Sequence, residues 1–166
     1  MPLPLAFLCK TMTSKMTAQE SFQTLKNFFE SRAASRQALM ALREGVEIGV
    51  VIGGSVECAL FRRGDLPVVE ARSAKEPDVV FYIQPESVEI LNSQTKDEIA
   101  DIGIKVVSEV LAGNITIKVP GRFLNLLSNG YLDIVKQGGA PVMSFLARHG
   151  LASVAKITAA IRRMKG

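Results

Sequence analysis

The chain has 166 residues, enough for one domain with a single core, and 48% of them are hydrophobic, as in an ordinary folded protein. Its net charge of +4 is unevenly divided: residues 1–43 carry +4, residues 44–147 carry −5 and residues 148–166 carry +5. The acidic middle argues against the contiguous basic stripe of a nucleic-acid-binding face, and two distant cysteines, Cys9 and Cys58, do not make a disulfide framework.

Residues 1–16 are expected to form a disordered leader. The apolar run at residues 2–9 has no basic residue before it and is too short to span a membrane, so it makes no convincing signal peptide, and secretion is the lesser alternative. The last residues, 162–166, are not a peroxisomal Ser-Lys-Leu signal. Cysteine usage favours a reducing compartment, so the expected location is the cytoplasm.

A helix is predicted over residues 17–43, with an interruption near Ser35 left open. Thr17 and Glu20 have the spacing of a capping box, which opens a helix, and Gly45 suits its end. Apolar residues recur near one face of this helix, which should therefore be buried. They are Phe22, Leu25, Phe29, Ala33 and Met40.

Three strands follow: apolar residues alternate over residues 46–52 and 56–60, and a turn at residues 63–65 leads into a third strand over residues 66–72. Glycine-containing turns separate them, which predicts antiparallel hairpins. A fourth strand over residues 78–84 ends at Pro85, which is well placed in the first turn of a short helix through Leu91.

The fourth strand is apolar on both faces. Val79, Phe81 and Ile83 point one way, and Val80 and Tyr82 point the other. A strand of this kind should be covered on both sides. The N-terminal helix is the expected second cover, and a homodimer interface is the rival explanation.

The second half of the chain predicts one strand among helices. Residues 95–98 repeat the capping-box spacing and precede an apolar helix that ends at Gly113. A strand with Ile115, Ile117 and Val119 on one face then runs through Pro120-Gly121 into a leucine-rich helix. Further helices are expected over residues 131–136, 140–148 and 151–164.

Reactive side chains are scarce. The single histidine, His149, lies at a predicted helix end, where histidine more often interacts with the helix terminus than transfers protons. Cys58 lies on a strand face that should be buried, where cysteine usually behaves as a small hydrophobic residue. Gly53 and Gly54 join two strands rather than open a helix, so they read as a turn and not as a phosphate site.

The carboxylates suggest no acid–base pair, because each lies in a first helical turn, where negative charge complements the helix dipole. They are Glu86, Glu89, Asp97, Glu98 and Asp101. The sequence contains no HExxH, CxxC, GxSxG or Walker motif. We therefore expect no enzymatic activity, no metal site and no cofactor.

Two segments resemble the sterol carrier protein 2 (SCP2) family: residues 78–91, DVVFYIQPESVEIL, and residues 113–135, GNITIKVPGRFLNLLSNGYLDIV. The family pattern has an aspartate opening an apolar strand, a short capped helix, and a strand between glycines that runs into a leucine-rich helix. With the preceding hairpins, the resemblance covers about residues 44–136. The matching positions are Asp78, Gly113, Gly121, Leu124 and Leu127.

The resemblance implies a lipid-carrier fold with an apolar tunnel between sheet and helices. The tunnel would take fatty acyl chains, sterol-like molecules or isoprenoid lipids, and the protein would bind or transfer them without covalent chemistry. We place its walls on the last two strands and on the helices that follow them. The predicted lipid-binding residues are Phe81, Ile83, Val88, Leu91, Ile102, Val106, Ile115, Ile117, Val119, Phe123, Leu124, Leu127, Met143 and Leu146.

The predicted fold class is α+β: a small, mainly antiparallel five-stranded sheet covered by helices, with an added N-terminal helix and C-terminal helices. One SCP2-like domain should span residues 17–166, with the N-terminal helix at 17–43, the core at 44–136 and a C-terminal helical lid at 137–166. The basic face of the last helix could also contact an anionic membrane. As an alternative function, the same groove would serve an accessory or regulatory subunit, by taking a partner protein or by presenting lipid to an enzyme.

Overall fold

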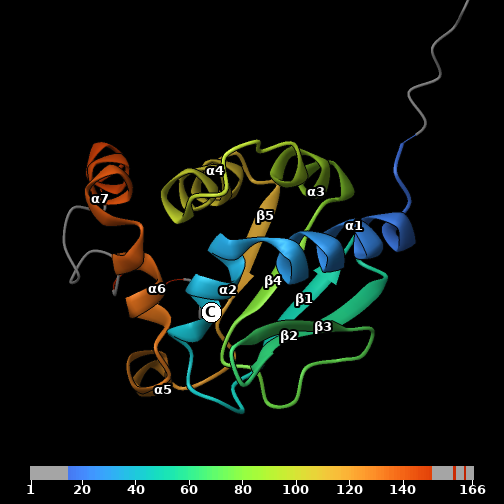
Figure 1. Ribbon diagram of the computed structural model, residues 1–166, viewed down its shortest axis with the longest axis horizontal. Coiled ribbons are helices and arrows are strands. Elements are labelled where there is room, and N and C mark those ends of the chain that lie inside the picture. Colours follow the sequence, from blue (N-terminus) through green and yellow to red (C-terminus); the bar gives the residue numbers. More distant parts are fainter. Residues whose placement is uncertain (1–14, 151–158, 160–162, 164–166) are drawn as a thin grey trace, which may run out of the picture.

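The computed structural model describes residues 15–150 together with Ala159 and Arg163 (Figure 1). Most of the expected leader, and the predicted helix over 151–164 apart from those two residues, lie outside the described residues. Lys15 pairs with Glu86 at 3.0 Å and Met16 packs against the core, so these two residues belong to the folded domain rather than to the leader.

A single five-stranded sheet forms the centre of the fold, as predicted. Its strands follow the order β3-β2-β1-β4-β5, and neighbours are antiparallel except for the parallel pair β1 and β4. This confirms the α+β class with a mainly antiparallel sheet. The strands are β1 (Ile48–Ile52), β2 (Val56–Arg63), β3 (Leu66–Glu70), β4 (Val80–Ile83) and β5 (Ile115–Lys118).

Glycines make the tight turns of both predicted hairpins. Gly53 and Gly54, between β1 and β2, have φ angles of 58° and 72°, a region that side chains with a Cβ rarely adopt. Gly64, between β2 and β3, has a φ of 63°. The hairpin order therefore follows directly from the glycine positions in the sequence.

The N-terminal helix is divided into α1 (Ala18–Ser31) and α2 (Ala33–Met40). The capping box at Thr17 and Glu20 is present, with both of its hydrogen bonds. The interruption falls at Arg32, whose backbone is extended, three residues before the predicted position.

Asp97 explains why the predicted capping box at residues 95–98 is wrong. Its carboxylate accepts hydrogen bonds from the backbone N–H groups of Ala33 and Ala34, at 2.9 and 3.1 Å. Asp97 therefore caps α2, a helix distant in the sequence. The helix that follows Asp97 begins after Glu98, which makes no side-chain cap.

The remaining helices match the predicted ones in order. Pro85 occupies the first turn of its short helix, where a missing backbone N–H costs nothing. Gly113 ends the long apolar helix with a φ of 82°. These helices are α3 (Pro85–Asn92), α4 (Ile99–Leu111), α5 (Phe123–Ser128), α6 (Tyr131–Gln137) and α7 (Gly139–Arg148).

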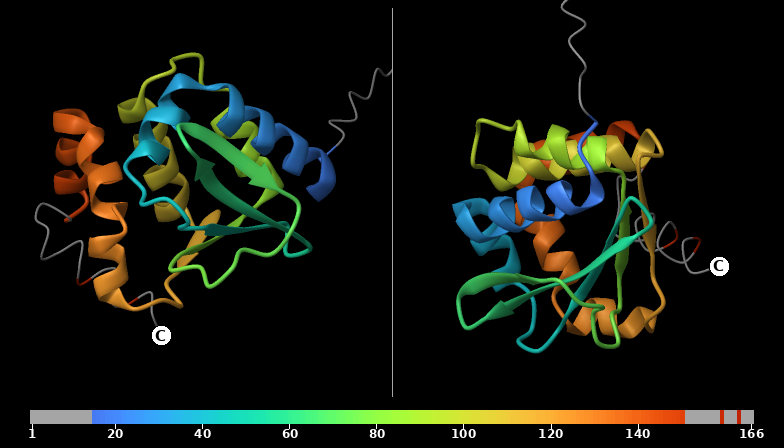
Figure 2. Two further views of the ribbon diagram at one scale, coloured as in Figure 1. Left: turned by 60° about the horizontal axis from the view of Figure 1, so that its bottom comes forward. Right: turned by 90° about the vertical axis from the view of Figure 1, so that its right-hand side faces the viewer.

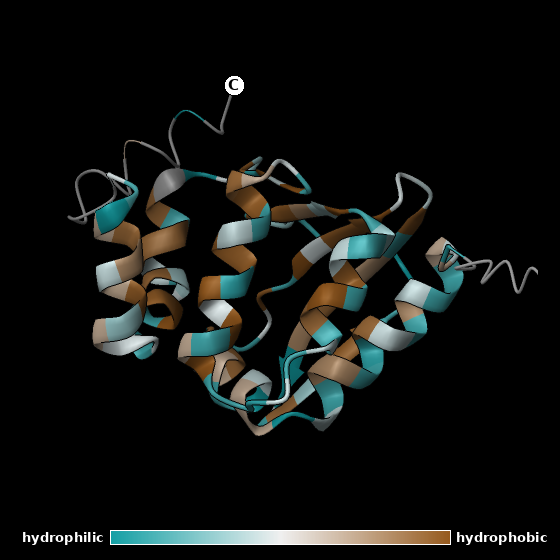
Figure 3. Ribbon diagram, turned by 90° about the horizontal axis from the view of Figure 1, so that it is seen from above, coloured by the Kyte–Doolittle hydropathy of each residue, from teal (hydrophilic) through white to brown (hydrophobic). Residues whose placement is uncertain are grey.

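Helices α1 to α4 lie on one face of the sheet, and α5 to α7 close one side of the space between these layers (Figures 1 and 2). Figure 3 shows hydrophobic and polar residues alternating around the helices, as expected when each helix buries one face. A buried cluster joins α1, α2 and α3 to the inner face of the sheet. Its most fully buried members include Leu25, Leu42, Ile52, Val88 and Ile115.

The expectation that α1 covers the second face of the sheet is wrong. Leu25 of α1 lines the same cavity as Val50 and Leu60, so α1 shares the inner face with the other helices. On the outer face Val80 is half-buried and Tyr82 is 37% exposed, partly covered by the loop between β3 and β4. A homodimer over this outer face stays a prediction.

Candidate functional site

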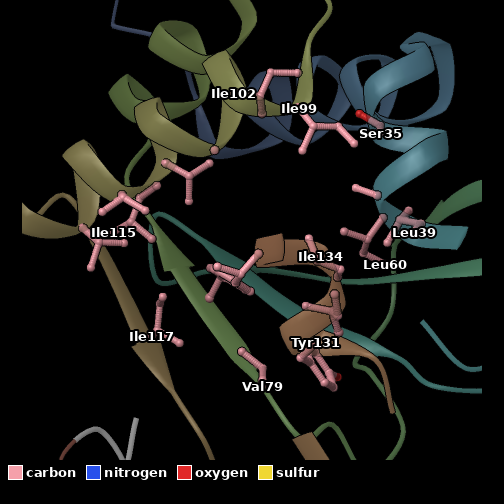
Figure 4. A pocket seen from close by; sticks show the side chains of 18 of the residues that line it. Ser35, Leu39, Leu60, Val79, Ile99, Ile102, Ile115, Ile117, Tyr131 and Ile134 are labelled. Carbon is pink, nitrogen blue, oxygen red and sulfur yellow. The ribbon is translucent and has the colours of Figure 1, made fainter. Parts of the chain in front are cut away.

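A cavity of about 420 Å³ lies between the inner face of the sheet and the helices. Its walls come from α1, α2, α4, α6, α7 and all strands except β3, with single contributions from α3 and α5. Figure 4 shows Ile99 and Ile102 of α4 at one side of the space, Ile115 and Ile117 of β5 at another, and Tyr131 of α6 opposite α4. The volume falls within the range of roughly 300–1,000 Å³ that is typical of small-molecule pockets.

Nine of the predicted residues lie on the cavity wall. The alternation in β4 and β5 determines most of them, since one face of each strand looks into the cavity. The predicted face of α4 also points inward. These nine are Phe81, Ile83, Leu91, Ile102, Val106, Ile115, Ile117, Val119 and Leu146.

Four predicted residues do not line the cavity. Val88 of α3 is buried in the core, and Met143 of α7 is half-buried. Leu124 and Leu127 point away into solvent, with 72% and 45% of their surface exposed. The side chain of Phe123, also predicted, lies outside what the structure describes.

Hydrogen bonds to Asp78 determine which face of α5 looks inward. The buried Asp78 carboxylate accepts hydrogen bonds from Asn125 Nδ2 at 3.1 Å and Asn129 Nδ2 at 2.7 Å. With the two asparagines held in this way, Leu126 is the α5 side chain that enters the cavity wall. The prediction of Leu124 and Leu127 was therefore wrong about the orientation of the helix.

Gly121 allows the chain between β5 and α5 to pass very close to Asp78. A Cβ at Gly121 would lie 2.5 Å from a carboxylate oxygen of Asp78 and 2.7 Å from its Cα, closer than real Cβ contacts. The Gly121 N–H also donates to the Asp78 carbonyl at 3.4 Å. The Pro120-Gly121 corner thus needs glycine because the chain leaves β5 directly against the start of β4.

The sequence prediction missed the contribution of the N-terminal helices and of α6. Leu25 and Phe28 of α1, Leu39 of α2, and Ile134 of α6 all line the cavity. Of these four, only Leu25 was among the positions that the apolar spacing placed on one helix face. In α2 that spacing pointed to Ala33 and Met40, both exposed, because the break at Arg32 turns Leu39 inward instead. Periodicity shows that a face is inward, but it does not tell whether that face meets other side chains or a cavity.

Among the described residues of the wall, Ser35 and Tyr131 are the ones with polar side chains, and each contributes a hydroxyl group. The Tyr131 oxygen is buried and has no hydrogen-bond partner among the described residues. Burial, together with the negative charge of Asp78, raises the pKa of this tyrosine above its usual range. The wall is therefore almost entirely apolar and carries no charge from any described residue.

The two most reactive candidates from the sequence lie outside the cavity wall. Cys58 is buried on the inner face of β2, and burial raises the pKa of its thiol to about 11, which disfavours the nucleophilic thiolate. His149 is exposed at the end of α7, where its Nδ1 lies 2.9 Å from the carbonyl oxygen of Phe145.

A second buried carboxylate, Glu109 of α4, is also engaged in structural hydrogen bonds. It accepts from Ser87 Oγ at 2.7 Å and from Asn114 Nδ2 at 3.1 Å. These bonds connect α3, α4 and the start of β5 outside the cavity wall. Within the described part of the chain, no three histidine, cysteine, aspartate or glutamate residues are grouped to hold a metal ion.

Among the described residues, no helix is long and apolar enough to cross a membrane. No family model matches the sequence, and no curated protein matches it significantly. One solved structure to which the chain is similar is titled "UbiJ-SCP2 Ubiquinone synthesis protein"; the sequence identity is 14% and the TM-score is 0.43, over 77% of this chain and 94% of that chain.

Proposed function

We propose that this protein binds and carries hydrophobic small molecules in the cavity, without catalysing a reaction on them. One observation carries the proposal: a cavity of about 420 Å³ whose described walls are almost wholly aliphatic and aromatic. Such a wall favours apolar molecules because binding removes their surface from water and leaves almost no polar group of the wall without a hydrogen bond. Fatty acyl chains, sterol-like molecules and isoprenoid lipids all have the required chemistry.

The energy available is sufficient for useful affinity. Each buried methylene group stabilises a complex by about 0.8 kcal/mol, so ten of them contribute about 8 kcal/mol. That gross figure corresponds to a dissociation constant of about 1 μM before the costs of immobilising the ligand. The same arithmetic implies weak discrimination between apolar ligands that differ by one methylene, which suits a carrier.

Native mass spectrometry of the full chain, purified without detergent, tests the proposal. We expect a population heavier than the polypeptide by the mass of a lipid, which organic extraction removes and readdition of a long-chain lipid restores. A protein that purifies without ligand and takes up no long-chain lipid after extraction would contradict it. If the same protein then bound an apolar helical peptide in the cavity, the accessory-subunit role would replace the carrier role.

A further inference from the structure

The absence of charge on the described cavity wall has a consequence for the kind of head group that fits inside. Ser35 and Tyr131 contribute hydroxyl groups there, and the other described lining side chains are aliphatic or aromatic or, in the case of glycine, absent. An ionised carboxylate moved from water into such surroundings loses hydration that nothing on the wall replaces. A hydroxyl, ester or ketone oxygen loses far less.

The two arginines nearest to Ser35 in the sequence are already engaged elsewhere. Arg32, which separates α1 from α2, donates to the carbonyl oxygen of Asn92 at 3.0 Å, and its guanidinium group lies 4.5 Å from the centre of the Phe28 ring. Arg36, one residue after Ser35, is exposed and pairs with Asp65. Neither arginine lines the cavity, so neither is placed to neutralise a buried anion.

A negative charge also lies near this end of the cavity. Asp97 holds the N–H groups of Ala33 and Ala34, directly before Ser35 in the chain. It would repel an anionic head group at Ser35. Elsewhere around the space, Asp101 and Lys105 of α4 are outside the wall, and Asp133 and Lys136 of α6 pair with each other at 3.7 Å.

The two hydroxyls offer hydrogen bonds to a neutral oxygen instead. Figure 4 shows Ser35 and Tyr131 on different sides of the cavity, Ser35 beside Ile99 and Tyr131 beside Ile134. Burying the Tyr131 hydroxyl without a hydrogen-bond partner is unfavourable. A ligand oxygen that accepted a hydrogen bond from this hydroxyl would remove that cost and so stabilise the complex.

We propose that the cavity takes neutral lipids, such as long-chain alcohols, esters or ketones, and excludes lipids whose head group is ionised. This inference rests on the proposed lipid-binding function and names the ligand class for the same site. The discrimination arises from the missing countercharge rather than from the shape of the wall, so ligands with identical chains should differ according to their charge.

The experiment compares hexadecanol, methyl palmitate and palmitate, which share a sixteen-carbon chain, by displacement of tritiated hexadecanol from the full-length protein. At pH 8 we expect palmitate to bind at least about ten-fold more weakly than hexadecanol, because its carboxyl group is ionised well above pH 5. The difference should narrow as the pH falls towards 5 and the neutral acid becomes populated. The ester should resemble the alcohol.

Charge can also be added to the wall in a matched pair of variants. Ile99→Lys places an ammonium group at the cavity edge beside Ser35, and Ile99→Met introduces a similarly unbranched side chain without the charge. We expect the lysine variant to bring palmitate at pH 8 to within about three-fold of hexadecanol, and the methionine variant to leave the wild-type difference in place.

Equal affinity for palmitate and hexadecanol at pH 8 would overturn the neutral-ligand inference and leave the lipid-binding function standing. Unchanged discrimination in Ile99→Lys, with the variant folded by circular dichroism, would likewise overturn it. Failure of all three ligands to bind would instead remove the proposed function itself, and the inference with it.

Discussion

The Asp78 carboxylate accepts a hydrogen bond of 2.7 Å from the amide of Asn129, 51 residues further along the chain. This contact, with the parallel one from Asn125, fixes α5 against the start of β4. As a result Leu126 enters the cavity wall while Leu127 stays at the surface. One buried carboxylate thus decides which side of a leucine-rich helix faces the cavity.

Asp78→Ala should lower the free energy of unfolding by roughly 1–3 kcal/mol, because two amide groups lose the charged acceptor that they share. Urea denaturation of the ligand-free protein measures the change. Asp133→Ala is the control: this exposed residue pairs with Lys136 at 3.7 Å, and its loss should cost no more than about 0.5 kcal/mol. Equal effects of the two substitutions would show that Asp78 does not hold α5.

Leu127→Trp should leave lipid uptake and stability close to those of the wild type. Leu127 is 45% exposed and outside the cavity wall, so a larger side chain has room in solvent. Uptake of tritiated hexadecanol, compared with the wild type, checks this expectation. A large loss of uptake would mean that the Leu127 face of α5 lines the ligand site, as the sequence alone predicts.

Glu47→Gln should destabilise the protein at neutral pH by roughly 1–3 kcal/mol, since the Glu47 carboxylate accepts two hydrogen bonds from Arg72 and one from the N–H of Lys75. The bonds from Arg72 lower the pKa of Glu47 from 4.5 to about 2. A pKa lowered by folding contributes stability that is complete above pH 4.5 and is lost as the pH falls towards 2.

The difference between wild type and Glu47→Gln should therefore shrink between pH 4.5 and pH 2, as followed by urea denaturation over that range. Glu76, an exposed residue of the β3–β4 loop that also contains Arg72 and Lys75, provides the comparison through Glu76→Gln, which should show little effect at any pH. A destabilisation that stays constant down to pH 2 would assign the effect to something other than the ion pair.

Tyr131→Phe should stabilise the ligand-free protein slightly, by about 1 kcal/mol, because it removes a buried hydroxyl without a partner and keeps the aromatic ring in the wall. Thermal unfolding of delipidated protein measures the shift. Destabilisation of similar size would show that the hydroxyl has a partner in the free protein.

The alternating strands and glycine turns of the first half were predictable because they depend on local chemistry. Gly53 and Gly54 require a turn, and Pro85 suits only the start of its helix. The inward faces of β4 and β5 followed from a period of two residues. Most of the correctly predicted cavity residues come from such regular elements.

The errors occurred where a distant residue decides local structure. Thr95 and Glu98 have the spacing of a capping box, yet the helix that follows has no side-chain cap, and Asp97 between them caps α2. The leucines of α5 surround that short helix, so periodicity alone could not choose between Leu126 and its neighbours. In the structure the hydrogen bonds to Asp78 and the packing of Leu126 with Val79 and Val119 orient the helix, and the hydrogen-bonded partners are about fifty residues apart.

Adjacent positions on β5 give the most direct test of whether the cavity holds the ligand. Ile117 lines the cavity, whereas Thr116 is exposed on the opposite face of the same strand, so tryptophan at each position differs chiefly in where its ring is placed. We predict that Ile117→Trp lowers the affinity for tritiated hexadecanol at least about ten-fold by filling the space, while Thr116→Trp stays within about two-fold of the wild type. Equal binding by the two folded variants would contradict the cavity as the ligand site.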